Sequence, residues 1–491
     1  ERTIKMNYLT ENLSMLCDFY ELTMANGYLV CGMGDRIVYF DAFYRSNPDN
    51  GGYAIAAGLE QIVNYINDLK FTPEDIEYLR SKNCFSEEFL KYLAKFRFTG
   101  DIWSVPEGTV VFPGEPLLIV RAPVMQAQFI ETYILMALNH QSLIATKASR
   151  MVRAAAGRPI SEFGARRAHG SAAAMLGARA AYIGGCASSS CTIADLRYGV
   201  PASGTMAHSW VQMFDDEYTA FKTYCEIYPD NAILLIDTYN VLESGLPNAI
   251  RAFREVLLPR GITKCGVRID SGDIAYLSRK VRERLDKEGF PQCKIIASNA
   301  LDEYIISELI SQGAQIDAFG IGERLITSKS DPVFGAVYKL AAVEDGQGRI
   351  IPKIKISENV GKITTPHFKK VYRLRDRESG KAEADLICIW DEKIDDTQPL
   401  EIFDPEYTWK RKTLTSFTAH ELLVPVFKAG KQVYRLPSLE EIRAHCAAEL
   451  EGIWDEVKRF TNPHNYYVDL SERLWQCRHD MIKAARARKS K

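Results

Sequence analysis

Between residues 159 and 321 the chain alternates short apolar runs with helical or loop segments, and this alternation limits the fold more than any other feature. Strands that alternate with helices form parallel sheets. Seven such strands favour an irregular α/β barrel, similar to a TIM barrel, over a doubly wound sheet, and the chemistry of a barrel lies at the carboxyl ends of its strands. The seven predicted strands are Ile160–Phe163, Ala181–Gly184, Val200–Thr205, Ala232–Asp237, Cys265–Asp270, Lys294–Ser298 and Ala318–Ile321.

The segments on either side of this region have different patterns. Residues 1–141 mix helical stretches with short strand-like runs separated by prolines and glycines, which predicts an α+β N-terminal domain. Residues 142–341 form the predicted barrel domain. Residues 342–491 begin with Asp345–Gly348, which predicts a hairpin turn, and we expect this C-terminal region to pack with the first.

Composition excludes several classes of protein. Lys and Arg number 61 against 63 Asp and Glu, a net charge of −2 that argues against a general nucleic-acid binder. No apolar run approaches the ~18–20 residues of a membrane span. The 11 cysteines are scattered without a CxxC pair, and no apolar segment of a signal peptide follows the N-terminal charges. We therefore expect a cytoplasmic protein with reduced thiols that binds neither nucleic acid nor membrane.

The segment from Gly266 to Asp273 is an apolar strand that ends in a group of polar residues. Arg268 could bind a carboxylate or phosphate through two parallel hydrogen bonds. Asp270 and Asp273 could hold ribose hydroxyls or a hydrated Mg²⁺ ion. The alternative is an ordinary strand and turn, but such a cluster at a predicted barrel mouth favours a binding site.

Three further segments place reactive or binding groups after strands. The glycines of Ala318–Gly322 leave backbone N–H groups free to bind a phosphate, and Asn299 after the preceding strand could assist. His208 follows a strand among small residues, where a histidine can act as base or nucleophile. Phe163 could stack on a planar ring and Arg166 could bind phosphate, although a core phenylalanine beside surface arginines is the alternative.

Lys147, Arg150 and Arg153 lie at positions i, i+3 and i+6 of one predicted helix. This spacing predicts a solvated cationic face, with a diphosphate site as the alternative. No P-loop, Ser-His-Asp signature or strong metal motif is present, and the metal ligands therefore remain unassigned.

Five segments, in this order and spacing, resemble the nicotinate phosphoribosyltransferase family, close to its bacterial members. They are Asp18–Met24, Phe163–Arg166, Ser203–Ser209, Arg268–Asp273 and Phe319–Gly322. The resemblance implies that nicotinate, 5-phosphoribosyl 1-diphosphate and ATP give nicotinate mononucleotide, diphosphate, ADP and phosphate, with Mg²⁺ as cofactor. This reaction is the first step of NAD synthesis from nicotinate.

The resemblance also implies roles for matching residues. The pyridine ring would lie between Phe163 and Tyr20, with Tyr20 supplied by the second subunit of a homodimer. His208 would be phosphorylated by ATP. Arg268 would lie near nicotinate and the phosphate groups, Arg166 would bind the phosphates, and Asp270 would face the ribose or Mg²⁺. The other expected substrate-binding residues are Ser190, Thr205, Ser271, Gly272, Asn299, Gly320 and Gly322. Lys339, Lys355, Lys362 and Lys369 would reach the ATP phosphates of the neighbouring subunit.

Ser190 stands where the related nicotinamide enzyme has an Asp, in our alignment with that family. An Asp would repel a carboxylate substrate, whereas a hydroxyl can donate to it, so Ser190 favours nicotinate. The chain departs from the family pattern around Cys186 and Ala187, at Glu323, and at His367. These departures keep open a transferase for nicotinamide or quinolinate, or an inactive barrel that serves as a scaffold.

Overall fold

The computed structural model describes residues 12–489, and the chain divides into two compact units. Unit 1 combines Glu1–Leu143 with Val333–Lys491, and unit 2 comprises Ile144–Pro332. The first and third sequence regions thus form one unit, and residues 333–341 belong to this unit rather than to the predicted central domain. The N-terminal charges that bear on the signal-peptide prediction lie outside the described residues.

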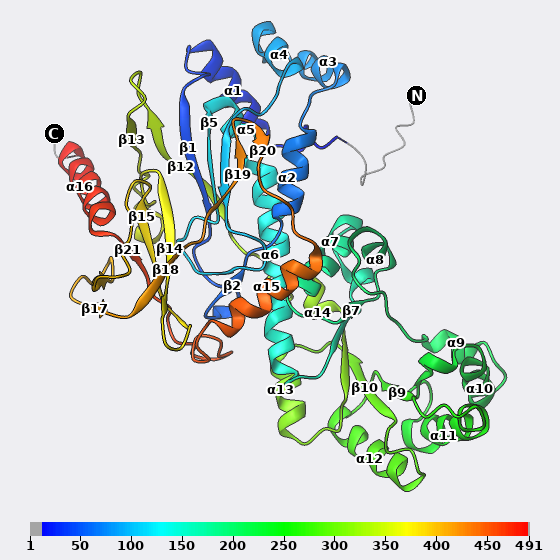
Figure 1. The fold of residues 1–491 in the computed structure, drawn as a ribbon. Helices are drawn as coiled ribbons and strands as arrows, with labels where there is room; N and C mark the ends of the chain where they lie inside the picture. Colours follow the sequence, from blue (N-terminus) through cyan, green and yellow to red (C-terminus); the bar gives the residue numbers. More distant parts are fainter. Residues whose placement is uncertain (1–11, 490–491) are drawn as a thin grey trace. The chain divides into compact units, whose positions relative to one another are not determined.

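Unit 2 is built on a six-stranded parallel sheet with the order β7-β6-β11-β10-β9-β8 (Figure 1). In chain order β6 is the first strand of this sheet and β11 the last, and the two pair with each other, with Phe319 opposite Ile160. Within residues 12–489 the sheet has two edges, β7 and β8, so the mixed α/β fold is confirmed and a closed barrel sheet is not observed. The strands are β6 Ile160–Glu162, β7 Ser188–Ser189, β8 Ile233–Leu235, β9 Gly266–Ile269, β10 Lys294–Asn299 and β11 Ala318–Ile321.

Two of the seven strand predictions are wrong. Ala181–Gly184 forms the end of helix α7 (Ser171–Ile183) and its cap, because a short buried apolar run has the same composition in a helix and in a strand. The second strand is instead Ser188–Ser189. Val200–Thr205 forms no strand, and one isolated bridge joins Ala202 to Ser189.

Helices flank the sheet of unit 2 and bury its apolar side chains. Val267 and Ile295 of neighbouring strands are fully buried with Phe221 and Phe253 in one core cluster. A turn of π-helix precedes α11 at Val241–Gly245 and another follows it at Phe253–Leu257. The helices are α7, α8 Thr192–Tyr198, α9 His208–Gln212, α10 Glu217–Ile227, α11 Leu246–Ala252, α12 Ile274–Lys287, α13 Glu303–Ser311 and α14 Glu323–Ile326, and α6 Glu131–Ala154 enters the unit from unit 1.

The main sheet of unit 1 has seven strands in the order β13-β12-β1-β5-β3-β19-β20. The predicted hairpin is confirmed, since β12 and β13 pair antiparallel around Asp345–Gly348. Strand β12 also pairs with β1, so distant parts of the chain share one sheet. The strands are β1 Ile37–Phe43, β3 Asp101–Ser104, β5 Leu118–Pro123, β12 Val337–Glu344, β13 Ile350–Pro352, β19 Val424–Lys428 and β20 Lys431–Gln432. The helices of the N-terminal segment are α1 Phe19–Val30, α2 Leu59–Asp68, α3 Pro73–Ser81, α4 Glu87–Ala94 and α5 Val124–Phe129.

A second sheet of unit 1 has the order β18-β14-β15-β21. Arg373 of β14 is fully buried and forms ion pairs with Asp385 and Glu449. The strands are β14 Lys369–Asp376, β15 Ala382–Ile389, β18 Phe417–Glu421 and β21 Val468–Leu470. Two small ribbons pair β2 Ala54–Ile55 with β4 Val110–Val111 and β16 Leu400–Phe403 with β17 Arg411–Leu414, and the helices are α15 Leu439–Glu451 and α16 Glu472–Lys489.

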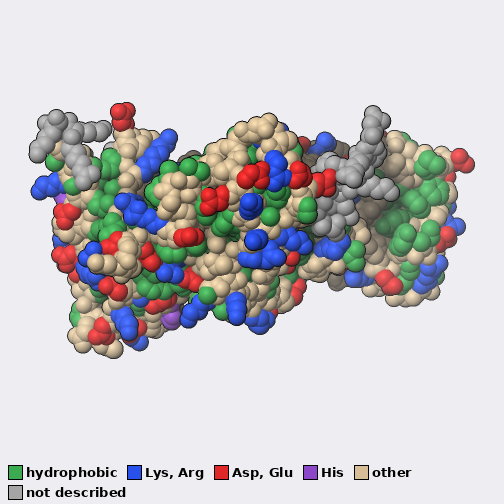
Figure 2. Space-filling model, turned by 90° about the horizontal axis from the view of Figure 1, so that it is seen from above, with side chains coloured by type: hydrophobic (Ala, Val, Ile, Leu, Met, Phe, Trp, Pro, Cys, Tyr) green, Lys and Arg blue, Asp and Glu red, His purple; other side chains and the backbone are tan. Residues whose placement is uncertain are grey.

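The surface charges, the cysteines and the helices can be compared with what the composition predicts. Lys and Arg side chains are interspersed with Asp and Glu on the face shown in Figure 2. All eleven cysteines are free thiols. None of the helices among residues 12–489 combines the length and the apolar composition needed to cross a bilayer.

Candidate active site

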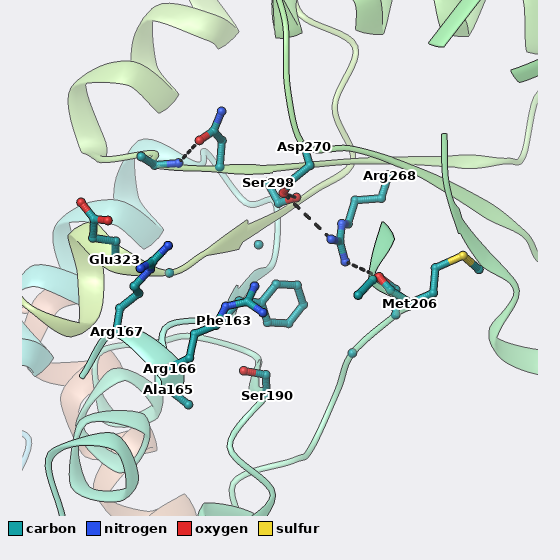
Figure 3. A pocket seen from close by; sticks show the side chains of 17 residues that line it. Phe163, Ala165, Arg166, Arg167, Ser190, Met206, Arg268, Asp270, Ser298 and Glu323 are labelled. Atoms are coloured by element: carbon teal, nitrogen blue, oxygen red, sulfur yellow. Dashed lines mark hydrogen bonds and ion pairs between the residues drawn. The ribbon is translucent and has the colours of Figure 1, made fainter. Parts of the chain in front are cut away.

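A cavity of about 480 Å³ lies at the carboxyl ends of the strands of unit 2 (Figure 3). Polar and small side chains line it, as expected for strand ends in a parallel α/β sheet. Nine residues singled out from the sequence line this cavity: Phe163, Arg166, Ser190, Thr205, Arg268, Asp270, Asn299, Gly320 and Gly322. Eight others were assigned no role beforehand: Ala165, Arg167, Gly204, Met206, Ala207, Ser298, Ala300 and Glu323.

Arg268 of β9 is held rigidly at one wall of the cavity. Its Nη1 donates to the Thr205 hydroxyl and, at 3.4 Å, to the Met206 carbonyl, while its Nη2 lies 4.0 Å from Asp270 Oδ1. The side chain is 13% exposed and burial lowers its pKa, opposed by the neighbouring carboxylates. Nε of Arg268 is buried and has no partner in the described residues. A guanidinium in this state is ready to bind an anion.

Asp270 belongs to a small network of oxygen atoms. Its Oδ1 accepts a hydrogen bond from the buried Ser298 hydroxyl. Asp237, which follows β8, accepts the Asp270 N–H at 3.2 Å and the Ser271 hydroxyl at 2.6 Å through Oδ2. Its other oxygen, Oδ1, is buried without a partner in the described residues. Two carboxylates are therefore tied together by the turn after β9.

The turn after β9 gives Ser271, Gly272 and Asp273 structural roles. Ser271 and Gly272 do not line the cavity, and the Ser271 hydroxyl is engaged by Asp237. Gly272 has a φ of +84°, which favours glycine. Asp273 caps helix α12 by accepting the Tyr276 N–H at 2.9 Å. Asp273 thus caps a helix and does not line the cavity, which gives no support to the expectation that it holds ribose or Mg²⁺.

Phe163 forms an aromatic wall of the cavity and packs against the backbone of two glycines, Gly320 and Gly322. A Cβ atom added at Gly320 would lie 2.6 Å from the Phe163 ring, so only glycine allows the ring its position. A Cβ at Gly322 would lie 3.1 Å from the Phe163 carbonyl oxygen. In Figure 3 the Phe163 ring lies between Ser190 and Arg268. This arrangement can receive a flat ring that carries an anionic substituent.

Cations and one carboxylate also line the cavity. Arg166 lies in the turn after β6, is exposed, and has no ion pair within the described residues. Glu323 binds Lys329 at 2.6 Å, and Lys329, with Arg167 and Arg324, lowers the pKa of Glu323. Arg324 binds Asp302 instead. Glu323 is thus partly neutralised by Lys329 beside the expected phosphate site.

His208 lies next to the cavity rather than in its lining. It begins helix α9, directly after Ala207, and its Nδ1 is 3.1 Å from the Thr238 hydroxyl. Thr238 follows Asp237, so the histidine and the carboxylate network are anchored to the same loop after β8. The imidazole is therefore oriented by a hydrogen bond without being buried.

Tyr20 lies in unit 1 and does not line the cavity of unit 2. It is 43% exposed on helix α1, and its pKa is raised by burial and by the nearby Glu131 carboxylate. Lys339 is 3.9 Å from the same carboxylate, while burial, Lys355 and Arg45 lower the Lys339 pKa. Unit 1 thus gathers an aromatic side chain and several cations in one place.

Three cations that sequence reasoning considered for phosphate binding have structural partners. Lys147 and Arg150 are buried in helix α6 and bind Glu303 at 2.9 and 2.8 Å, so they form neither a solvated face nor a diphosphate site. Lys369 is 1% exposed and binds Asp41 at 2.6 Å. It also donates to the carbonyls of Thr365, Pro366 and His367 at 2.7–3.2 Å, so the expectation that it reaches ATP is wrong. Lys355 and Lys362 are exposed.

The sequence resembles one family throughout its length. Three family models match the chain. The nicotinate phosphoribosyltransferase (NAPRTase) N-terminal domain matches residues 15–139, the NAPRTase family matches residues 159–374, and the C-terminal domain matches residues 368–478. The nicotinate phosphoribosyltransferase of Bacillus subtilis is 42% identical over 485 residues, covering 99% of this chain and 98% of that protein. A nicotinate phosphoribosyltransferase of Mycobacterium tuberculosis is 37% identical over 94% of this chain and 92% of its own length.

Solved structures agree with the sequence matches. The human nicotinic acid phosphoribosyltransferase superposes with a TM-score of 0.81 at 28% identity, over 95% of this chain and 100% of that chain. The nicotinate-nucleotide pyrophosphorylase of Pyrococcus furiosus superposes with a TM-score of 0.70 at 24% identity, over 92% and 98% of the two chains, and supports the fold alone.

Proposed function

The chain belongs to the nicotinate phosphoribosyltransferase family and is an enzyme of that class, and we propose that it joins nicotinate to 5-phosphoribosyl 1-diphosphate with the help of ATP. The products are nicotinate mononucleotide and diphosphate. The observation that carries the proposal is the cavity of unit 2, which combines an aromatic wall, a buried guanidinium, exposed arginines and bare glycine backbone.

Each part of the cavity suits one part of the two substrates. Phe163 stacks on the electron-poor pyridine ring. Arg268, already fixed by Thr205 and Met206, has a free buried Nε that can meet the nicotinate carboxylate or a phosphate oxygen. Arg166 binds the diphosphate. The backbone near Gly320, Gly322 and Asn299 holds the 5′-phosphate.

The transfer itself requires little proton movement. Diphosphate leaves, positive charge develops at the anomeric carbon, and the pyridine nitrogen attacks that carbon. The residues act by holding nicotinate and the ribose in line and by stabilising the charge of the departing diphosphate. Because Arg166 has no ion pair in the described residues, its charge is available for this task.

Magnesium fits the carboxylates near the cavity. Mg²⁺ is commonly held by one or two carboxylates together with substrate phosphates and water. Asp237 Oδ1 is a buried oxygen without a partner, and Asp270 lines the cavity. No set of three or more acidic, Cys or His side chains converges as a metal site in residues 12–489, so the substrate must supply the remaining ligands. When bound, the ion neutralises diphosphate charge, and Asp237 and Asp270 are the residues that would hold it.

His208 is the proposed acceptor of the ATP phosphoryl group. Its imidazole is accessible, is oriented by Thr238, and lies beside the residues that line the cavity. Phosphorylation of His208 would place two negative charges close to Arg268 and Asp237 and so change the affinity of the site for its substrates. Replacing His208 with Ala should abolish ATP hydrolysis and ATP stimulation while some basal transfer remains. Unchanged ATP coupling would exclude His208 from this role.

A homodimer completes the proposed site. Tyr20 and the cations near Lys339, which stand in unit 1, would serve the cavity of a partner subunit. The exposed apolar side chains on and before helix α1, among them Leu16, Phe19 and Met24, support burial at an interface. Tyr20→Ala and His208→Ala proteins, each deficient in ATP-stimulated transfer, should complement each other in that activity after subunit exchange. Random exchange into two-fold dimers would restore about one quarter of the wild-type ATP-stimulated activity.

Two broader properties belong to the same proposal. The bridge between Ser189 and Ala202 carries the sheet of unit 2 beyond β7, which supports an irregular α/β barrel. The free state of the eleven thiols supports a location in the reducing cytoplasm.

The decisive experiment is an assay of the pyridine mononucleotide formed from nicotinate, nicotinamide or quinolinate, each with and without ATP. Product from nicotinate, increased by ATP, is the expected result. Ser190 in the cavity wall favours nicotinate over the two alternatives. Product only from another pyridine would identify a sister transferase, and absence of product from all three would favour a scaffold role.

A further inference from the structure

Glu162 is a fully buried carboxylate directly behind the aromatic wall of the cavity. It is the last residue of β6 and precedes Phe163. Its Oε1 accepts the backbone N–H of Gly164, and its Oε2 accepts the Ser189 hydroxyl at 2.7 Å. Among the described residues no Lys, Arg or His forms an ion pair with it, so two hydrogen-bond donors carry the stabilisation of the carboxylate.

The main chain at Glu162 repeats the connection made by the side chain. Its carbonyl oxygen accepts the Ser190 N–H at 2.8 Å. Ser189, bound to the carboxylate, in turn accepts the Cys191 N–H at 3.0 Å through its hydroxyl oxygen. One residue thus ties the Phe163–Gly164 turn to the loop of residues 189–191. These two segments carry the aromatic ring and the Ser190 hydroxyl of the cavity.

The glycine at position 164 makes this connection possible. A Cβ atom there would lie 2.6 Å from Glu162 Oε1 and 2.7 Å from Ile326. Any larger residue would therefore push the carboxylate away from the amide it binds. The turn and the carboxylate are matched to each other as one unit.

The arrangement is costly for stability alone. Burying a carboxylate without a cation is unfavourable, and burial raises the pKa of Glu162 against the opposing hydrogen bonds from Ser189 and Gly164. Charge-assisted hydrogen bonds are short and directional, and they fix geometry better than apolar packing. A group of this kind is suited to holding two loops at a set spacing.

We propose that Glu162 is a positioning residue that sets the spacing between the Phe163 ring and the Ser190 hydroxyl and so determines affinity for the pyridine substrate. This inference rests on the proposed function. Glu162 does not line the cavity, and it acts through Phe163, Gly164 and Ser189. Among the described residues this carboxylate forms no hydrogen bond or ion pair with Asn299 or Glu323 at the phosphoribosyl end of the cavity, so that end should respond little.

The test compares steady-state kinetics with nicotinate and 5-phosphoribosyl 1-diphosphate varied separately. Glu162→Ala should raise the KM for nicotinate about tenfold, the equivalent of ~1.4 kcal/mol, and leave the KM for the phosphoribosyl donor within about twofold. Glu162→Gln keeps an oxygen for the Gly164 N–H and an amide that can donate to Ser189, so it should retain most of the affinity. Ser189→Ala should give an intermediate rise in the KM for nicotinate.

Glu283→Ala serves as the matched control, because this glutamate of α12 is 71% exposed and its removal should change neither constant. If Glu162→Ala does not fold, the Ser189→Ala and Glu162→Gln pair carries the same comparison. An equal rise in both KM values, or no rise in the KM for nicotinate in Glu162→Ala and Ser189→Ala, would overturn the inference. No product from the wild-type chain would remove the proposed function, and this inference with it, whereas an active wild type with unaffected variants removes the inference alone.

Discussion

Gly320→Ala should weaken pyridine binding by moving one aromatic ring. The ideal Cβ of residue 320 lies 2.6 Å from both Cδ2 and Cε2 of Phe163 and 3.4 Å from Cβ of Ser298. Carbon atoms pack without repulsion at about 3.5–4.0 Å, so the ring must retreat by ~1 Å. Neither the backbone of β11 nor the buried Ser298 can yield easily, and the strain falls on Phe163.

The expected size of the effect follows from the cost of overpacking. One added methyl group in a filled site costs about 1–3 kcal/mol. If half of that cost is lost from the free energy of stacking between Phe163 and the pyridine ring, the KM for nicotinate rises roughly three- to tenfold, because 1.4 kcal/mol corresponds to a factor of ten. The rest appears as a lower melting temperature.

A double-mutant cycle assigns the effect to the ring. In a Phe163→Ala background, Gly320→Ala should raise the KM for nicotinate no further, because the methyl group meets empty space. Gly346→Ala in the β12–β13 turn is the control for glycine replacement, since a Cβ there contacts nothing within 4 Å. An unchanged KM for nicotinate in Gly320→Ala, or the same rise with and without Phe163, would refute the reasoning.

Three other changes test other parts of the molecule. Burial raises the pKa of Glu21 to about 8, so the folded state holds the Glu21 proton more tightly than the unfolded state does. The stability that this proton supplies is present below pH ~4.5 and is lost as the pH rises through 8. Glu21→Gln should flatten the fall in the free energy of unfolding between pH 5 and 8, a slope of at most ~1.4 kcal/mol per pH unit in urea titrations. Lys369→Met leaves Asp41 buried without its cation and should lower the free energy of unfolding by about 3–5 kcal/mol, with partial recovery in Lys369→Met/Asp41→Asn. Ser190→Asp should lower kcat/KM for nicotinate at least ~10-fold and raise it for nicotinamide, and unchanged selectivity in a competition assay would exclude Ser190 from contact with the substrate carboxylate.

The elements of the fold that could be predicted are those with long or strongly patterned signals. The sequence predicts a strand at Ile37–Tyr44, a helix at Leu59–Leu69 and a turn at Asp345–Gly348, and the structure has them at Ile37–Phe43, Leu59–Asp68 and Asp345–Gly348. Ser188–Ser189 could not be found, since two serines carry no strand pattern and owe their conformation to pairing with β6. Tertiary packing similarly decides that Ala181–Ile183 continues a helix.

Within the site, residues that follow strands were predictable because parallel strands end at one edge of a sheet. Phe163 and Asp270 are examples, and Arg268 lies one residue before the end of β9. Lys147 and Arg150 are structural residues because both form ion pairs with the buried Glu303. Glu303 lies about 150 residues further along the chain, so the sequence pattern around the two cations gives no sign of this pairing. Asp237 ends a recognised apolar run, so its position was visible, but its unpartnered oxygen appears only once β8 and β9 lie side by side.

The pairing of β1 with β12 has a consequence for synthesis on the ribosome. The two strands begin at Ile37 and Val337, so the first must wait for 300 further residues before its neighbour exists. At ~5–20 residues per second this delay is about 15–60 s. During that time one edge of β1, with its buried Val38, Phe40 and Ala42, has no strand to pair with. The nascent chain therefore carries an unpaired strand edge for most of its translation, and such an edge can pair with other chains until β12 has been made.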